Sequence, residues 1–206
     1  MQTFTITLYQ FDELTDSAKE KAREWYREGM EFCSFYGADV VSECVEIAAL
    51  FGLYIEPKSV YYAVGGYCND GACFTGTYRY AQQSVKRITS EYCAEYIDGK
   101  SSWVYEPIQI ARDLQSVQRK YFYRLYASTS GNGRYHSQRT SVDIDDYNRE
   151  LLTEDAETVE QCITDYASWI HTRLNEEYEY QNSDEQVDES IRINEYTFTA
   201  EGEREG

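Results

Sequence analysis

The chain has 206 residues, of which 37 are acidic and 19 are basic, so its formal net charge is −18. Aromatic residues make up 16% of the sequence, which excludes an acidic disordered protein and indicates a packed core. The negative charge argues against binding to nucleic acid or to anionic membranes over most of the surface. Neither a long apolar run nor a basic leader segment is visible, so we expect a cytoplasmic protein.

The first half of the chain predicts a strand, two helices and a β-hairpin. Polar and apolar residues alternate over 2–9, which is typical of a half-buried strand. Thr15 can cap a helix over about 15–30, and Gly52 suits the left-handed position that ends a second helix over 39–51. The strands expected next are 53–55, 60–67 and 73–80. An Asp-Gly pair between the last two is typical of a hairpin turn.

The second half of the chain predicts another hairpin among helices. Helices are expected over 83–97, 107–118 and about 153–180. Strands are expected over 121–128, 135–144 and 196–199, with a glycine-rich turn between the first two. Ser183 and Gln186 form the ends of a capping box that opens a short helix to about Ile193.

These elements indicate an α+β fold with a mainly antiparallel sheet, two β-hairpins and helices packed on one face of the sheet. No internal repeat and no low-complexity linker interrupts the chain. We therefore expect a single domain over residues 1–206, with an acidic helical portion at 150–206.

The motifs of common catalytic sites are absent, both the Gly-x-Ser-x-Gly of hydrolases and the phosphate-binding loop. His171 and Cys162 are nine residues apart on one predicted helix, about 13 Å, which is too far for a nucleophilic pair. The six cysteines do not follow a zinc-type spacing. The acidic group Asp143, Asp145 and Asp146 suits a solvated loop or a divalent cation site. We expect no catalytic residue, no metal and no cofactor, with an enzyme as an alternative.

The negative charge is concentrated near the C-terminal end. Residues 143–206 hold 20 acidic and 4 basic groups, a net charge of −16, whereas residues 1–142 sum to −2. Four carboxylates follow at helical spacing: Asp184, Glu185, Asp188 and Glu189. They would place four charges along about 6–8 Å of helix axis, comparable to the one charge per ~1.7 Å of duplex DNA. This segment either imitates nucleic acid in a basic groove or is a solvated acidic face.

The 21 tyrosines are the second unusual feature. They lie on both predicted hairpins and in the acidic end, and some must be exposed because strands alternate faces. Exposed tyrosine among acids is typical of protein-binding hot spots, although tyrosine is also a favourable strand residue. The binding residues that we predict are Glu176, Glu177, Tyr178, Glu179, Tyr180, Asp184, Glu185, Asp188 and Glu189.

Several stretches, taken in order, resemble a widespread and mostly uncharacterised family of bacteriophage and prophage proteins that are often labelled antitoxin-like. They include Ala18-Lys19-Glu20-Lys21-Ala22-Arg23-Glu24-Trp25-Tyr26, Asp70-Gly71-Ala72-Cys73-Phe74-Thr75-Gly76, Gly133-Arg134-Tyr135-His136 and Glu195-Tyr196-Thr197-Phe198-Thr199. The resemblance implies a phage accessory protein with an anti-defence role, of the anti-CRISPR or anti-restriction type, in the bacterial host cytoplasm.

Charge and resemblance together predict an acidic interaction protein that inhibits a host defence or nucleic-acid-handling complex. The expected partner is a host protein with a basic groove, either a defence nuclease or a nucleic-acid-guided complex. Direct contact with nucleic acid or with a membrane is not expected. The alternative is an antitoxin that binds and neutralises a cognate toxin.

Overall fold

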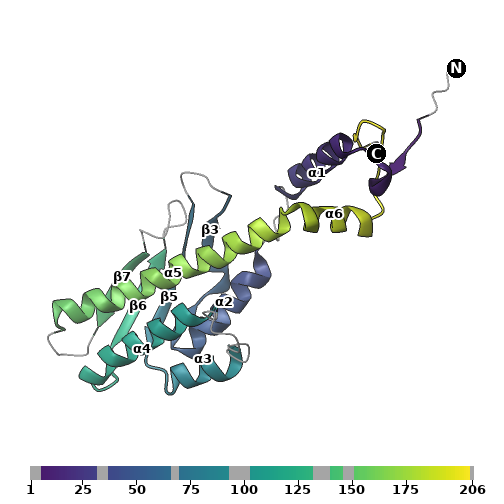
Figure 1. Cartoon of the computed structure of the whole chain (residues 1–206). Helices are drawn as coiled ribbons and strands as arrows, with labels where there is room; N and C mark the ends of the chain where they lie inside the picture. Colours follow the sequence, from purple (N-terminus) through teal and green to yellow (C-terminus); the bar gives the residue numbers. More distant parts are fainter. Residues whose placement is uncertain are drawn as a thin grey trace. The chain divides into compact units, whose positions relative to one another are not determined.

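Figure 1 shows the protein as a computed structural model. The structure describes residues 6–31, 37–65, 70–92, 103–131, 140–145 and 151–204. The chain divides into two compact units. Unit 1 joins Met1–Tyr36 to Glu176–Gly206, and unit 2 spans Gly37–Asn175. The single domain expected from the sequence stays a prediction.

The predicted α+β class is confirmed, since helices and antiparallel strands make up both units (Figure 1). The helices of the described residues are α1 (Asp16–Glu31), α2 (Ala38–Leu50), α3 (Ser84–Tyr92), α4 (Tyr105–Lys120), α5 (Thr153–Gln181) and α6 (Asp184–Ile193). The described part of each predicted helix begins and ends within about three residues of its expected bounds. The remainder of the predicted helix 83–97 lies outside the described residues.

Unit 2 contains a four-stranded antiparallel sheet in the order β2-β5-β6-β7. Its strands are β2 (Leu53–Ile55), β5 (Gly76–Arg79), β6 (Tyr126–Gly131) and β7 (Thr140–Asp145). A separate antiparallel pair is formed by β3 (Tyr61–Ala63) and β4 (Gly71–Cys73). All pairings between described strands are antiparallel.

One face of the four-stranded sheet is buried and the other is open. Leu53, Tyr78 and Ala127 lie opposite one another in the register and are at most 2% exposed. They join the apolar core formed with α2, α4 and α5. Their neighbours along the strands, such as Arg79, point to the other face and contact solvent, because side chains alternate. The helices therefore pack on one face, as predicted.

The first predicted hairpin is wrong in detail. The expected strand 73–80 is divided, since β4 pairs with β3 whereas β5 joins β2 and β6. At the break, the Ser59 hydroxyl donates to the Thr75 carbonyl at 2.8 Å and accepts from the Thr75 amide at 3.2 Å, and the Glu56 amide donates to the same carbonyl at 3.3 Å. The Thr75 amide thus binds a side chain in place of a neighbouring strand.

The second predicted hairpin begins later than expected, because 121–125 is not strand. The buried Gln118 side chain at the end of α4 donates to the Leu125 carbonyl at 2.8 Å and accepts from its amide at 3.2 Å. The side-chain amide of Gln118 thus takes the place of a neighbouring strand at Leu125, so the pairing between β5 and β6 starts only at Tyr126. The part of the predicted strand 135–144 that precedes Thr140 lies outside the described residues.

Unit 1 is built from α1, α6, a short 3-10 helix η1 (Phe11–Glu13) and a two-stranded ladder. The ladder pairs β1 (Tyr9–Gln10) with β8 (Thr197–Phe198), so the predicted strand 2–9 contributes only its end. The unit has its own apolar core, which consists of Phe11, Leu14, Ala18, Ala22, Val187, Ile191 and Phe198. Two predicted caps are confirmed, since Thr15 and Ser183 accept hydrogen bonds from the amides of Ala18 and Gln186.

None of the helices in the described part of the chain combines the length and the apolar composition that a membrane span requires.

Candidate protein-binding surface

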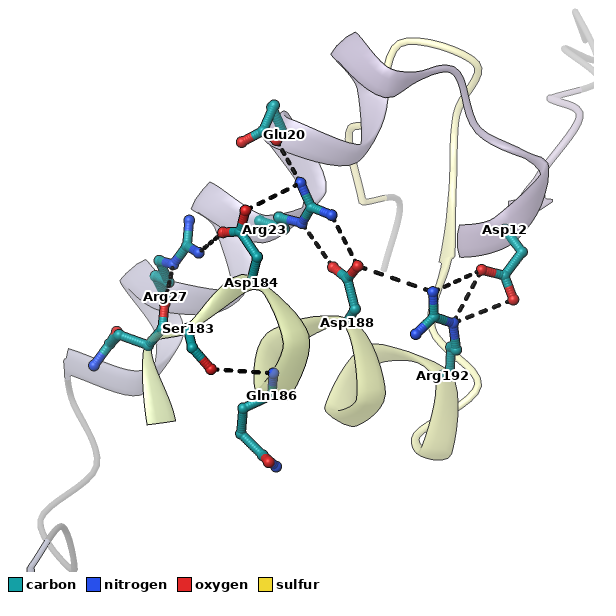
Figure 2. A network of polar contacts seen from close by, with 10 residues as sticks. Asp12, Glu20, Arg23, Arg27, Ser183, Asp184, Gln186, Asp188 and Arg192 are labelled. Atoms are coloured by element: carbon teal, nitrogen blue, oxygen red, sulfur yellow. Dashed lines mark hydrogen bonds and ion pairs between the residues drawn. The ribbon is translucent and has the colours of Figure 1, made fainter. Parts of the chain in front are cut away.

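Two arginines of α1 oppose two aspartates of α6 (Figure 2). The Nε and Nη2 atoms of Arg23 donate to Asp188 Oδ1 and Oδ2 at 2.6 and 2.8 Å, in the bidentate geometry that guanidinium favours. Arg27 Nη2 donates to Asp184 Oδ1 at 2.5 Å, and its Nε donates to the Asn182 carbonyl at 3.0 Å. The members of each row are four residues apart, so both rows run along their helices and match in spacing.

Further charged groups extend this network. Arg192 Nε donates to Asp12 at 2.9 and 3.2 Å, and Arg192 Nη2 lies 3.9 Å from Asp188 Oδ2. Glu20 forms an ion pair with Arg23. The Arg192 and Arg23 guanidinium groups lie 5.3 and 5.9 Å from the ring centre of buried Phe11. The polar network thus rests directly on the apolar core of unit 1.

The network changes the acidity of its members. The hydrogen bond from Arg27 is the main cause that lowers the pKa of Asp184, and the hydrogen bond from Arg192 lowers the pKa of Asp12. The hydrogen bond to Asp188 raises the pKa of Arg23. These groups therefore stay ionised over the whole physiological range, and the network keeps its charges.

The four carboxylates predicted to form one binding row on α6 divide into two kinds. Asp188 has only 15% of its side chain exposed and Asp184 has 64%, and both are bonded to arginine. Glu185 and Glu189 are exposed, and no residue in the described ranges forms an ion pair with either of them. The free charge on this side of α6 is therefore two carboxylates rather than four.

The predicted binding residues on the last turns of α5 do not form one face. Glu176, Glu179 and Tyr180 are exposed and share one side of the helix by their spacing of three and four residues. Tyr180 is 57% exposed. Glu177 and Tyr178 lie on the other side and are half-buried, and Glu177 accepts a hydrogen bond from Gln181 at 2.7 Å.

The structure adds two carboxylates that the sequence analysis did not select. Glu24 and Glu28 are exposed on α1, next to the row of Arg23 and Arg27, and form no ion pair within the described residues. We name the set Glu24, Glu28, Glu185 and Glu189 the acidic rim. The matched spacing of arginines on α1 and aspartates on α6 was the sequence signal for this arrangement.

Unit 1 contains most of the charge of the protein. Its two segments hold 18 acidic and 6 basic residues, a net charge of −12, which leaves −6 for unit 2. Internal arginines neutralise the inner row of carboxylates, whereas the acidic rim faces water. This arrangement can attract a cationic surface and hold it by contacts with individual carboxylates.

The described residues contain no group of three or more side chains suited to hold a metal ion. Asp143 and Asp145 are exposed on β7, while Asp146 and His136 lie outside the described ranges. The cysteines Cys44, Cys73 and Cys162 are buried. Burial raises the pKa of Cys44 and of Cys162 to about 12, so neither forms a nucleophilic thiolate at neutral pH.

These features define an α+β protein with an acidic helical unit. A family described as "Domain of unknown function (DUF8835)" matches residues 16–184, from the start of α1 to the start of α6, and the chain belongs to this family. No curated protein and no solved structure matches the chain significantly.

Proposed function

We propose that unit 1 is a binding module that presents the acidic rim to a basic surface on another protein. The observation that carries this proposal is the division of charge on α6. Arginines bind Asp184 and Asp188 and fix the helix against α1, whereas Glu185 and Glu189 stay exposed. A fixed row of carboxylates loses little conformational freedom on binding, which favours affinity for a complementary cationic surface.

The partner chemistry follows from this division. Two exposed carboxylates one turn apart, about 6 Å along the axis, match lysine and arginine side chains better than they match the charge density of a DNA strand. We therefore propose recognition of individual basic side chains in a groove, with Tyr180 as the aromatic contact nearest in sequence.

The biological setting belongs to the same proposal and is supported by the resemblance to phage proteins. A phage accessory protein of this chemistry would bind a host nuclease or nucleic-acid-guided complex in the groove that holds its nucleic acid. Binding there would inhibit the complex by competition, without any reaction catalysed by this chain.

A capture experiment with a matched control tests the proposal. The tagged full chain is compared with Glu185→Lys/Glu189→Lys and with Glu157→Lys/Glu160→Lys, which makes the same charge change at exposed positions of α5 in unit 2. We expect the first variant to lose a basic partner that the wild type and the control retain. Capture of the same partner by all three proteins would refute the role of the acidic rim.

A second measurement separates inhibition from binding. The captured partner is mixed with its labelled DNA or RNA, and the wild-type protein is added. We expect displacement of the nucleic acid, and no displacement by Glu185→Lys/Glu189→Lys. A ternary complex with the nucleic acid still bound would refute competition, and a small toxin as the captured partner would favour the antitoxin alternative.

A further inference from the structure

One end of the open sheet face in unit 2 gathers arginine and tyrosine side chains around a pocket of about 440 Å³. The pocket is lined by Arg79, Tyr80, Tyr123, Arg124, Leu125 and Tyr126. Arg79 at the end of β5 lies opposite Tyr126 at the start of β6, so the sheet register brings the two together. The pocket volume falls within the range of about 300–1,000 Å³ that small-molecule sites occupy.

Aromatic rings at this end of the sheet are open to water. The ring centres of Tyr80 and Tyr123 lie 4.4 Å apart, with the ring planes tilted by 39°. Tyr54, whose ring lies 4.6 Å from the Arg79 guanidinium, is 40% exposed, Tyr123 is 46% exposed and Phe122 is 63% exposed. Several exposed aromatic rings near one pocket are a feature of interaction sites.

The backbone beside the pocket is strained. Phe122 and Tyr123 both have positive φ angles, 54° and 61°, in the turn that ends α4. The Tyr123 amide donates to the Gln118 carbonyl at 2.8 Å, which is the bond of a helix-terminating turn that glycine normally serves. Two bulky aromatic residues stand here in its place, and such strain is found where a side chain is needed for binding.

The cations of the pocket are available to an anion. Arg79 and Arg124 are exposed, and neither forms an ion pair with a carboxylate in the described ranges. Asp145 on β7 lies opposite Tyr126, on the side away from Arg79. The positive end of the face is therefore narrow, and it suits a single phosphate group.

We infer that this pocket binds a nucleotide, with the base stacked on the Tyr80–Tyr123 pair and the phosphate bound by Arg79 and Arg124. Every base can stack on an aromatic ring, and arginine recognises phosphate through paired hydrogen bonds. The nucleotide is either free or one unit of a single strand. The inference is independent of the proposed function, and it differs from the expectation of no direct contact with nucleic acid, which rests on the net negative charge.

Calorimetric titration of the full chain tests the inference. Adenosine monophosphate is compared with adenosine, with inorganic phosphate and with a single strand of about ten thymidylates. We expect adenosine monophosphate or the oligonucleotide to bind with a dissociation constant of about 1 mM or lower, and adenosine and phosphate to bind about tenfold more weakly. Binding of adenosine monophosphate would identify the ligand as a free nucleotide. Binding of the oligonucleotide alone would identify the ligand as a single strand.

Variants locate the binding. Tyr123→Gly removes the ring and suits the positive φ angle, so the thermal unfolding midpoint should stay the same or rise. The affinity for the nucleotide should fall about tenfold. Arg79→Gln/Arg124→Gln should weaken the binding of the phosphate-bearing ligand by a similar factor and leave the affinity for adenosine unchanged. The controls Tyr61→Ala and Arg112→Gln replace exposed residues outside the pocket and should bind as the wild type does.

Three outcomes would overturn the inference. The first is the absence of detectable binding by both adenosine monophosphate and the oligonucleotide. The second is equal affinity in the wild type and in the Tyr123 and arginine variants. The third is equally tight binding of a hexaglutamate peptide, because the pocket would then recognise negative charge without recognising a base.

Discussion

Arg23 on α1 binds both carboxylate oxygens of Asp188 on α6, although 165 positions separate the two residues in the chain. Each side chain is only 15% exposed. The pair lies beside the contact between Ala22 and the apolar residues of α6, so it fixes the two helices in one register. Unit 1 thus positions its exposed glutamates by neutralising its inner aspartates.

The first prediction concerns this pair. Arg23→Met leaves Asp188 without its main partner, and we expect unit 1 to lose about 1–3 kcal/mol of stability. Hydrogen exchange measured by mass spectrometry should show faster exchange in α1 and α6, with α2 to α4 as an internal reference. The double variant Arg23→Met/Asp188→Asn should cost less than the sum of the single changes, because the partners are coupled.

Lys21→Met is the control for the first prediction. Lys21 is exposed on the same helix and has no ion pair within the described residues, so its replacement should change stability by no more than about 0.5 kcal/mol. If Arg23→Met were as mild as Lys21→Met, the pair would not fix the helix register.

The second prediction concerns acid stability in unit 2. Lys120 Nζ and the Tyr121 hydroxyl donate to the buried Asp155 carboxylate at 2.6 and 2.9 Å. The hydrogen bond from Lys120 is the main cause that lowers the pKa of Asp155. The contribution of this carboxylate to the stability of the fold is therefore fully present above its pKa in the unfolded chain, about 3.9. It is lost as the pH falls through the lower pKa of the folded protein.

Asp155→Asn tests the second prediction in denaturant unfolding at several pH values. At pH 7 we expect the variant to be about 1–3 kcal/mol less stable than the wild type. The gap should narrow below about pH 4, where the wild-type carboxylate becomes protonated. Glu154→Gln at the exposed neighbouring position should show little pH-dependent gap. A gap for Asp155→Asn that stays constant with pH would contradict the assigned role of Lys120.

Periodicity and caps were sufficient to predict the helices. The apolar stripes and the capping residues Thr15 and Ser183 act over one or two turns, so they are visible in a short stretch of sequence. The strands were less predictable because distant side chains end them. Gln118 binds both backbone groups of Leu125, and Ser59 binds those of Thr75, and neither contact follows from local alternation.

The candidate protein-binding surface could likewise be predicted only in part from local sequence patterns. Helical spacing correctly placed Asp184 above Asp188 and Glu185 above Glu189. It did not show which of these rows faces α1, because that depends on how the apolar cores of two distant segments pack. The paired rows Arg23–Arg27 and Asp184–Asp188 become a visible pattern only when the two helices are considered together.

The third prediction compares two glycines. Gly52 ends α2 with a φ of 93°, and a Cβ atom there would lie 1.9 Å from the Arg79 carbonyl oxygen. Gly52→Ala should therefore cost at least about 2 kcal/mol in thermal or denaturant unfolding. Gly29 lies within α1 with no atom within 4 Å of such a Cβ, so Gly29→Ala should stabilise by about 0.5–1 kcal/mol. Similar effects of both changes would contradict the close approach of β5 to Gly52.

The fourth prediction concerns the kinetics of partner binding through the acidic rim. Exposed charges are screened beyond about 10 Å at 0.1 M salt and beyond about 3 Å at 1 M. The association rate should therefore fall at least about tenfold between roughly 0.05 and 0.5 M salt, with a smaller change in the dissociation rate. Surface plasmon resonance of the captured partner measures both rates.

Neutral variants show which charges produce this salt effect. Glu185→Gln/Glu189→Gln should slow association at low salt and flatten its dependence on salt, because these carboxylates have no internal arginine partner in the described structure. Glu157→Gln/Glu160→Gln removes the same charge from exposed positions of unit 2 and should leave the slope nearly unchanged. Equal slopes for both pairs would assign the attraction to total charge, and the arginine-bound register of α6 would then be irrelevant to binding.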